Sequence, residues 1–252
     1  MNSPSYQFSR RRVAELDCGI VHPVDQSTPI ESMAIFCHGY GAGGDDLVGL
    51  AQEILQIAAP TAGTMLVFPA APLSLEDEGM PGGRAWWHLS IQRLLSAIED
   101  GQYELVRAEV PDGIDEARIK LTATVQQLLD ENRLNESNLL LGGFSQGAML
   151  SMDVATRGLE NPPAAMTLFS GCLICERQWK PGIARLSSTK IFQSHGRLDP
   201  ILPLQTGKWL TDLLSENGCE VDFKEFNGVH TIPMESIEKS AHLLAQLTDV
   251  HR

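Results

Sequence analysis

A chain of 252 residues is long enough to bury a hydrophobic core without disulfide bonds or a metal ion. Its 43% hydrophobic and 20% charged residues are the balance of an ordinary globular protein. The formal net charge of -13 repels phosphate backbones and anionic lipid head groups, so we expect no nucleic acid among its partners.

The chain alternates short apolar runs with longer amphipathic segments. Residues 11–23 (RRVAELDCGIVHP) predict a β-hairpin, and residues 33–37 (MAIFC) predict a strand buried on both faces. A glycine-rich turn follows, and Asp45 or Asp46 is expected to cap a helix over 46–58. Further strands are predicted at 64–69, 138–143, 164–171, 190–196 and 220–226, and further helices at 113–133, 147–157, 204–218 and 234–250. This alternation indicates an α/β protein with a mostly parallel central sheet and helices on both faces.

One segment interrupts this alternation. Residues 72–111 are far too long for an ordinary connection of a few residues, and they contain Trp86, Trp87 and at least one short helical pattern. Long insertions of this kind often serve as lids or binding loops. We therefore predict a single domain over 1–252 with a lid-like insertion at about 73–111.

The five cysteines are predicted to be free thiols. Their number is odd and a chain of this length needs no disulfide, which favours a reducing, cytoplasmic compartment. Cys172 and Cys175 form a CxxC motif, but no second ligand pair of similar spacing is present for zinc. The alternatives for this motif are a redox couple and two small buried apolar side chains. No apolar run is long enough to span a membrane, and the N-terminal segment lacks the apolar core of a signal peptide.

Residues 143–147 (GFSQG) match the pattern G-x-S-x-G between a predicted strand and a predicted helix. At such a turn the hydroxyl of Ser145 projects from the edge of the sheet as a nucleophile, and the helix N-terminus directs backbone N–H groups toward a developing oxyanion. The alternative is a tight turn that needs its glycines for steric reasons alone. A serine nucleophile also needs a histidine base and an orienting carboxylate, which follow it in the order acid, histidine in α/β hydrolases.

Four histidines follow the serine in the chain: His195, His230, His242 and His251. His251 lies next to the C-terminus, and His242 lies inside the last predicted helix. His195 lies between a strand and a loop. His230 falls in a loop after the last predicted strand, where the histidine of such a site belongs, so we select it as the base. The alternative for His230 is a solvated loop residue.

The candidate acids are Asp153, Glu160, Asp199 and Asp222. Asp153 falls in the helix behind the serine, and Asp222 falls inside a predicted strand. Asp199 follows the predicted strand 190–196 in a loop, and loops at the carboxyl ends of strands are where active sites gather in open α/β sheets. We select Asp199 over the alternative that it only forms an Asp-Pro turn.

Seven segments together carry a family likeness. They are FCHGYGAGG (36–44), VFPAAP (67–72), GGRAWW (82–87), GGFSQGAML (142–150), LFSG (168–171), SHGRLDPILP (194–203) and VHTIP (229–233). The sequence resembles the phospholipase/carboxylesterase family of α/β hydrolases, which includes the acyl-protein thioesterases. The resemblance spans nearly the whole chain and implies the α/β-hydrolase fold. It also implies a catalytic triad of Ser145, Asp199 and His230.

The resemblance further implies an oxyanion hole made by the backbone N–H groups of Gln146 and Tyr40. The family commonly has leucine at the place of Tyr40, and a tyrosine there is able to narrow the acyl entrance. It usually has glycine at the place of Val229, before the catalytic histidine. His38 and His195 correspond to histidines that shape the family's loops rather than transfer protons.

These residues predict a serine carboxylesterase that acts on small-molecule esters of short-to-medium acyl chains. His230, oriented by Asp199, takes the proton of Ser145 as its Oγ attacks the carbonyl, and water then hydrolyses the acyl-serine. We expect neither a cofactor nor a metal ion. Trp86 and Trp87 are predicted to line an acyl pocket, the alternative being ordinary packing onto the core.

Other functions remain as alternatives. An acyl-protein thioesterase or a lysophospholipase would use the same site with a longer acyl pocket. A non-catalytic binding protein of the same fold is disfavoured by the intact order of serine, aspartate and histidine. A serine peptidase is disfavoured because the sequence shows neither an extra domain nor a site for a peptide terminus. Families of this type often dimerise, and the sequence leaves a homodimer open.

Overall fold

In the computed structural model, which describes residues 5–57 and 63–249, eight strands form one sheet. The strands are β1 (Tyr6–Val13), β2 (Leu16–Pro23), β3 (Ser32–Cys37), β4 (Thr64–Pro69), β7 (Leu139–Phe144), β8 (Ala165–Phe169), β9 (Lys190–Gly196) and β10 (Val221–Phe226). Their order across the sheet is β1-β2-β4-β3-β7-β8-β9-β10. The pairs β1–β2 and β2–β4 are antiparallel, and the remaining pairs are parallel. The predicted α/β class with a mostly parallel sheet is confirmed.

The central strands are continuous apolar runs because both of their faces are covered. Every residue of β3, β4 and β8 is buried. Successive side chains of β3 enter opposite cores, with Ile35 in the hydrophobic cluster on one face and Phe36 in the cluster on the other.

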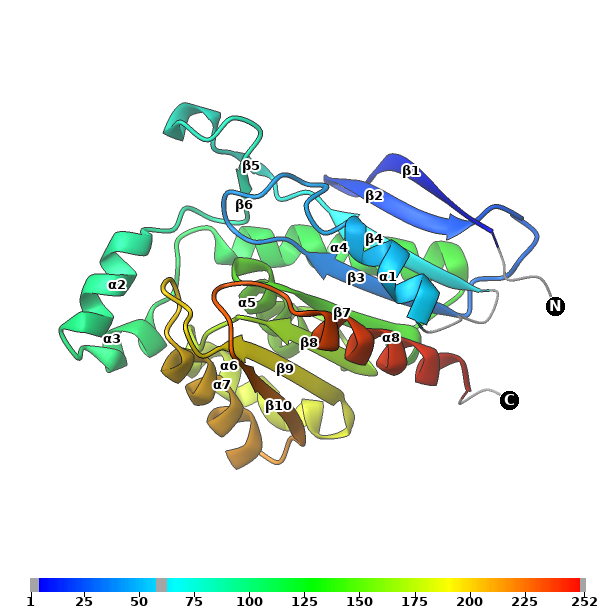
Figure 1. Ribbon diagram of the computed structural model, residues 1–252. Helices are drawn as coiled ribbons and strands as arrows, with labels where there is room; N and C mark the ends of the chain where they lie inside the picture. The colour runs from blue at the N-terminus through cyan, green and yellow to red at the C-terminus, as the bar shows by residue number, and fades with distance from the viewer. Residues whose placement is uncertain (1–4, 58–62, 250–252) are drawn as a thin grey trace.

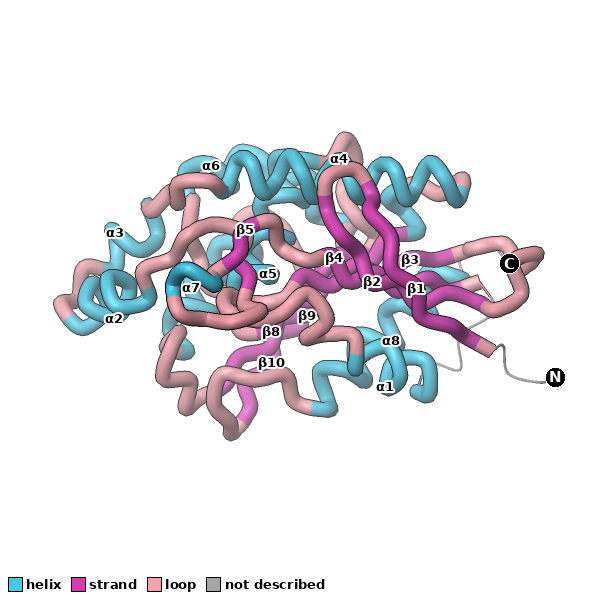
Figure 2. Tube along the Cα trace, turned by 90° about the horizontal axis from the view of Figure 1, so that it is seen from above, coloured by secondary structure: helices cyan, strands magenta, loops and turns pink. Residues whose placement is uncertain are grey.

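Two groups of helices cover the two faces of the sheet. The helices α1 (Gly49–Ile57) and α8 (Met234–Asp249) share one core with the sheet, and α4 (Ile114–Asn132), α5 (Gln146–Asp153), α6 (Glu176–Ile183) and α7 (Leu204–Glu216) share the other. Figure 2 shows α1 and α8 on one side of the strands and α4 and α6 on the opposite side. No helix within the described ranges is both long enough and apolar enough to cross a membrane.

The helix that precedes β4 begins later than predicted. It starts at Gly49 rather than at residue 46, because the preceding residues form turns in which the Val48 N–H donates to the Asp45 carbonyl oxygen at 3.0 Å. The Asp45 carboxylate pairs with Arg10 on β1 instead of capping the helix. The predicted ends of this helix and of α8, at residues 58 and 250, lie outside the described residues.

Two further helical segments differ from the prediction. The helix predicted over 147–157 ends as α5 at Asp153 and continues as a π-helical segment, Val154–Gly158. The sequence analysis assigns no element to the residues of α6, a helix that contains Pro181. The predicted stop of α7 near Gly218 is confirmed, because this glycine has a φ of 88° and the next N–H, of Cys219, bonds the Leu214 carbonyl oxygen at 3.0 Å.

The long insertion between β4 and α4 has its own secondary structure. It contains the short strands β5 (Leu73–Ser74) and β6 (Arg84–Ala85), the 3-10 turn η1 (Glu76–Glu78), and the helices α2 (Ile91–Glu99) and α3 (Tyr103–Ala108). Figure 1 shows α2 and α3 beyond the end of the sheet toward which β3 and β9 point. The insertion therefore lies on the side of the sheet where its parallel strands end.

All five cysteines are free and buried. Burial raises the pKa of the Cys175 thiol to about 12 and raises the pKa of the Cys172 thiol further. Thiols with such pKa values stay protonated and unreactive near neutral pH. This environment favours two small apolar side chains over a redox couple for the CxxC motif.

Candidate active site

Ser145 occupies the sharp turn between β7 and α5. Its φ of 54° and ψ of -116° are outside the regions that non-glycine residues ordinarily adopt. The turn is held in place by the Ser145 N–H, which donates to the Phe169 carbonyl oxygen of β8 at 2.8 Å. The side chain therefore stands at the carboxyl end of a central strand, and the residue is 9% exposed.

The glycines on either side of Ser145 are required by close contact with β3. A Cβ atom on Gly147 would lie 2.0 Å from the Cys37 carbonyl oxygen, and one on Gly143 would lie 2.5 Å from the same atom. Both distances are far shorter than van der Waals contact. Only glycine therefore lets the turn at Ser145 pack against the end of β3 in this geometry.

His230 and Asp199 lie in direct contact. His230 Nδ1 is 2.6 Å from Asp199 Oδ2, and an N–H at this position donates to the carboxylate. The other carboxylate oxygen accepts the N–H groups of Ile201 and Leu202, each at 2.9 Å. Burial by itself would raise the pKa of Asp199, but the hydrogen bonds from His230 and from the two backbone N–H groups outweigh burial and lower the pKa. Asp199 is thus held as a carboxylate beside the imidazole.

His230 shares a cavity with Ser145. The imidazole packs against Phe144, the residue before the serine, with ring centroids 4.6 Å apart. Ser145 and His230 both line a cavity of about 100 Å³ whose walls include the apolar side chains of Met149 and Ile201. The structure thus places a serine hydroxyl and a carboxylate-bound imidazole around one small apolar space.

The other candidate acids do not line the cavity at Ser145. Asp153 is fully buried and accepts hydrogen bonds from Arg118 and Arg157, at 3.0 and 2.9 Å, and from Trp179 Nε1 at 2.8 Å. Asp222 lies on β10 and pairs with Lys239 of α8. The remaining candidate, Glu160, lies in the segment between α5 and β8, and its backbone carbonyl oxygen accepts a hydrogen bond from Arg185.

The other candidate histidines have structural partners. His242 is exposed on α8 and its Nδ1 lies 2.6 Å from the Glu238 carbonyl oxygen. His195 Nε2 lies 2.7 Å from the Leu202 carbonyl oxygen and 3.5 Å from Asp199 Oδ2. Burial lowers the pKa of His195, which keeps its ring neutral. His251 lies outside the described residues.

His38 is also locked in the backbone around the site. Its Nε2 accepts the Ala71 N–H at 3.0 Å, so its Nδ1 carries the hydrogen that donates to the Gly39 carbonyl oxygen at 2.8 Å. Burial lowers the pKa of His38 and keeps the ring neutral. These contacts fit the expectation that His38 shapes the loop after β3.

Comparison with known sequences identifies the family. The sequence profile described as Phospholipase/Carboxylesterase matches residues 20–248. The chain belongs to the phospholipase/carboxylesterase family. It is accordingly a serine hydrolase of the carboxylic ester class, as the sequence motifs predict.

Two curated relatives cover most of this chain. Acyl-protein thioesterase 1 of Kluyveromyces lactis is 26% identical over 232 residues, which are 90% of this chain and 96% of the relative. Acyl-protein thioesterase 1 of Saccharomyces cerevisiae is 30% identical over 218 residues, covering 82% of this chain and 89% of the relative.

Solved structures show the same fold. The crystal structure of esterase PE8 aligns with a TM-score of 0.71 at 23% identity, covering 96% of this chain and 99% of that one. Acyl-protein thioesterase 2 of Zea mays aligns with a TM-score of 0.65 at 23% identity, covering 92% and 98%. At these identities the likeness concerns the fold, which is the α/β-hydrolase fold.

The two residues expected to supply the oxyanion hole, Gln146 and Tyr40, both lie next to Ser145. Gln146 is the first residue of α5, and the N–H groups of a first helical turn have no carbonyl partner within their helix. Tyr40 lies in the loop after β3, and both residues flank the site, with Tyr40 in the wall of the same cavity as Ser145. The positive end of the helix dipole lies at Gln146 as well.

The side chain of Gln146 has a role that the sequence analysis missed. Its Oε1 accepts the Trp86 N–H at 3.0 Å, and its Nε2 donates to the Trp87 carbonyl oxygen at 2.8 Å. The residue after the serine therefore fastens the insertion to the turn that carries Ser145. No local pattern reveals this contact, because the partners are about sixty residues apart in the sequence and are backbone groups.

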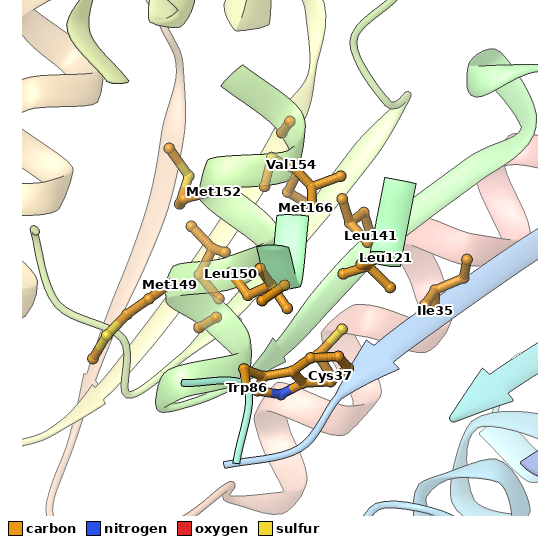
Figure 3. Close-up of a cluster of buried hydrophobic side chains, with 14 of the residues drawn as sticks. Ile35, Cys37, Trp86, Leu121, Leu141, Met149, Leu150, Met152, Val154 and Met166 are labelled. Carbon is orange, nitrogen blue, oxygen red and sulfur yellow. The ribbon is translucent and has the colours of Figure 1, made fainter. Parts of the chain in front are cut away.

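Trp86 and Trp87 are core residues. Both side chains are buried, and Figure 3 draws Trp86 within the cluster of buried side chains that also contains Cys37. Trp86 Nε1 donates to the His38 carbonyl oxygen at 2.9 Å. Neither tryptophan lines the cavity at Ser145, so the structure favours core packing over the acyl-pocket role predicted for them. The large apolar surface of these rings is used to anchor the insertion.

No group of three or more histidine, cysteine or acidic residues is arranged to hold a metal ion in the part of the chain that the structure describes.

Proposed function

We propose that this protein is a carboxylesterase of short acyl esters and that Ser145, His230 and Asp199 perform its chemistry. The observation that carries the proposal is the 2.6 Å contact between His230 Nδ1 and Asp199, in a cavity that His230 shares with Ser145. A histidine bound to a carboxylate through Nδ1 has Nε2 free to accept a proton.

The proposed reaction has two halves. His230 Nε2 takes the hydroxyl proton as Ser145 Oγ attacks the ester carbonyl, and the resulting imidazolium is stabilised by Asp199. When the tetrahedral intermediate collapses, the C–O bond to the alcohol breaks and His230 protonates the leaving oxygen. Water then adds to the acyl-serine with His230 again as base, which releases the acid and restores the hydroxyl.

We assign the oxyanion hole to the backbone N–H groups of Tyr40 and Gln146. These two donors come from different segments, one from the loop after β3 and one from the first residue of α5. Donors fixed by the backbone are already oriented before charge develops on the carbonyl oxygen, which is the condition for effective electrostatic stabilisation.

The size of the cavity supports short acyl chains. Its volume of about 100 Å³ is well below the range of roughly 300–1,000 Å³ that is usual for drug-sized ligands. The apolar residues of its wall suit an alkyl chain, and Asp46 is the acidic residue among those that line it.

Acyl-protein thioesterase activity is the second candidate. It is favoured by the relatives, because the Kluyveromyces lactis and Saccharomyces cerevisiae proteins with this name cover most of the chain. The same residues would cleave a thioester with a thiol as the leaving group.

We propose the cytoplasm as the compartment in which the reaction takes place. Five buried thiols are compatible with work in the cytoplasm, where thiols stay reduced. A homodimer stays a prediction from the family resemblance.

The test is hydrolysis of p-nitrophenyl esters from acetate to palmitate, with Ser145→Ala as the matched control. We expect turnover with a maximum at short chains and loss of turnover in Ser145→Ala. A palmitoyl thioester measured in parallel decides between the two candidates, since preference for it over short esters would favour the thioesterase. Turnover that survives in Ser145→Ala would contradict the assigned nucleophile.

A further inference from the structure

A second, larger cavity adjoins the one at Ser145. It has a volume of about 1000 Å³ and is lined mostly by the insertion, with residues of α2, α3 and the segment that follows them in its wall. The two cavities share three lining residues, Tyr40, Leu89 and Leu94. These three side chains therefore form the partition between the inner cavity at Ser145 and the outer cavity.

The Tyr40 side chain is fastened to the insertion. Its hydroxyl donates to Glu78 Oε2 at 2.8 Å, and the other oxygen of Glu78 lies 2.8 Å from His88 Nδ1. The three residues come from the loop after β3, from η1 and from the segment after β6. Burial and the neighbouring Glu78 raise the pKa of Tyr40 to about 12, so its hydroxyl remains a donor at neutral pH.

The backbone next to Tyr40 is held independently of this hydrogen bond. The Gly41 N–H donates to the Arg84 carbonyl oxygen at 2.9 Å, and the Arg84 N–H donates to the Ala42 carbonyl oxygen at 3.0 Å. Rotation of the Tyr40 side chain therefore leaves its backbone N–H in place. The partition is able to open without dismantling the proposed oxyanion hole.

We propose that Tyr40, held by Glu78, is the gate between the two cavities and sets the acyl chain length that the enzyme accepts. With the hydrogen bond formed, an acyl chain is confined to the inner cavity. With it broken, the chain extends past Leu94 into the outer cavity, where Leu105, Val106 and Val110 supply apolar wall. This inference rests on the proposed esterase function and adds a specificity-determining pair to it.

The two partners of the hydrogen bond provide the test. Tyr40→Phe removes one oxygen atom and keeps the ring, and Glu78→Ala removes the acceptor. The quantity measured is the ratio of kcat/KM for p-nitrophenyl octanoate to that for p-nitrophenyl acetate. We expect each variant to raise this ratio by about tenfold, the order of one hydrogen bond to a charged group, chiefly through a lower KM for octanoate. The double variant should rise no further, because both substitutions delete the same bond.

Glu176→Ala is the matched control. This substitution breaks the 2.7 Å ion pair with Arg107, which connects α3 of the insertion to α6. Glu176 is not part of the partition between the two cavities. The octanoate-to-acetate ratio of this variant should stay within about twofold of the wild type, because Glu176 lines neither cavity. A rise equal to that of Tyr40→Phe would overturn the gate, because general loosening of the insertion would then set chain length.

Two other results also overturn the inference. One is an unchanged ratio in Tyr40→Phe while acetate is still hydrolysed, which shows that the site is folded and that the hydroxyl does not restrict chain length. The other is a wild type without Ser145-dependent hydrolysis of any ester, in which case the proposed function fails and the gate fails with it. If Glu78→Ala does not fold, Tyr40→Phe still deletes the same bond.

Discussion

The two segments around the Ser145 turn are buried at every residue from Leu139 to Gly143 and from Gln146 to Asp153. The insertion at 72–111, in contrast, exposes large apolar side chains such as Tyr103 and Leu105. Leu105 is 62% exposed, and Ser145 is 9% exposed. The first region is fixed by contacts with central strands, and the second is tied to the core at a few points. The difference places the proposed chemistry on rigid elements and leaves substrate selection to a segment that is easier to alter.

The largest effect should come from His230, in the rigid region. His230→Ala removes the proposed base and should lower kcat/KM for p-nitrophenyl acetate by about 10⁴-fold, the upper range for general base catalysis. His242→Ala is the control, because that imidazole is exposed on α8 away from the cavity, and its activity should match the wild type. Equal losses in both variants would contradict the assignment of the base.

The tight packing behind Ser145 predicts the next effect. Gly147→Ala should destabilise the fold by about 3 kcal/mol, because its Cβ would lie 2.0 Å from the Cys37 carbonyl oxygen. Gly49→Ala serves as the control, since a Cβ at the start of α1 has no atom within 4 Å and its helix gains from alanine. Denaturant unfolding measures both. A tolerated Gly147→Ala would show that the turn is less rigid than its contacts indicate.

The contact that joins the two regions should give a smaller change. Gln146→Ala leaves the Trp86 N–H and the Trp87 carbonyl oxygen buried without their partner, at a cost of about 2 kcal/mol. Gln102→Ala is the matched control in the insertion, because that side chain is exposed and makes no capping hydrogen bond to α3. Thermal unfolding compares the two variants, and equal melting temperatures would mean that the insertion is anchored by other contacts.

The smallest effect concerns acid stability. Because the pKa of folded Asp199 is below its usual value of about 3.9, the carboxylate stabilises the fold above that pH and loses this contribution as pH falls through the lowered value. The difference in Tm between the wild type and Asp199→Asn should therefore shrink as the pH falls below 4. A difference that grows between pH 4 and pH 2 would contradict the sign of this pKa shift.

Much of the fold was predictable because it follows from local patterns. The strands predicted at 33–37 and 64–69 are continuous apolar runs, which is the pattern of strands buried on both faces of a sheet. Both occur where predicted. Helix ends and special turns were less predictable. The late start of α1 is one example, because Asp45 lies in a turn before the helix and its carboxylate pairs with Arg10 of a distant strand.

What the sequence by itself determined is the order of chemical groups: a serine between glycines, then Asp199, then His230, each after a predicted strand. Tertiary structure decided which side chains meet. It brought His230 to 2.6 Å from Asp199, buried Trp86 and Trp87 in the core, and joined Tyr40 to Glu78. The reason is physical, because periodicity and turn chemistry act over a few residues, whereas these contacts join segments that only the packed sheet brings together.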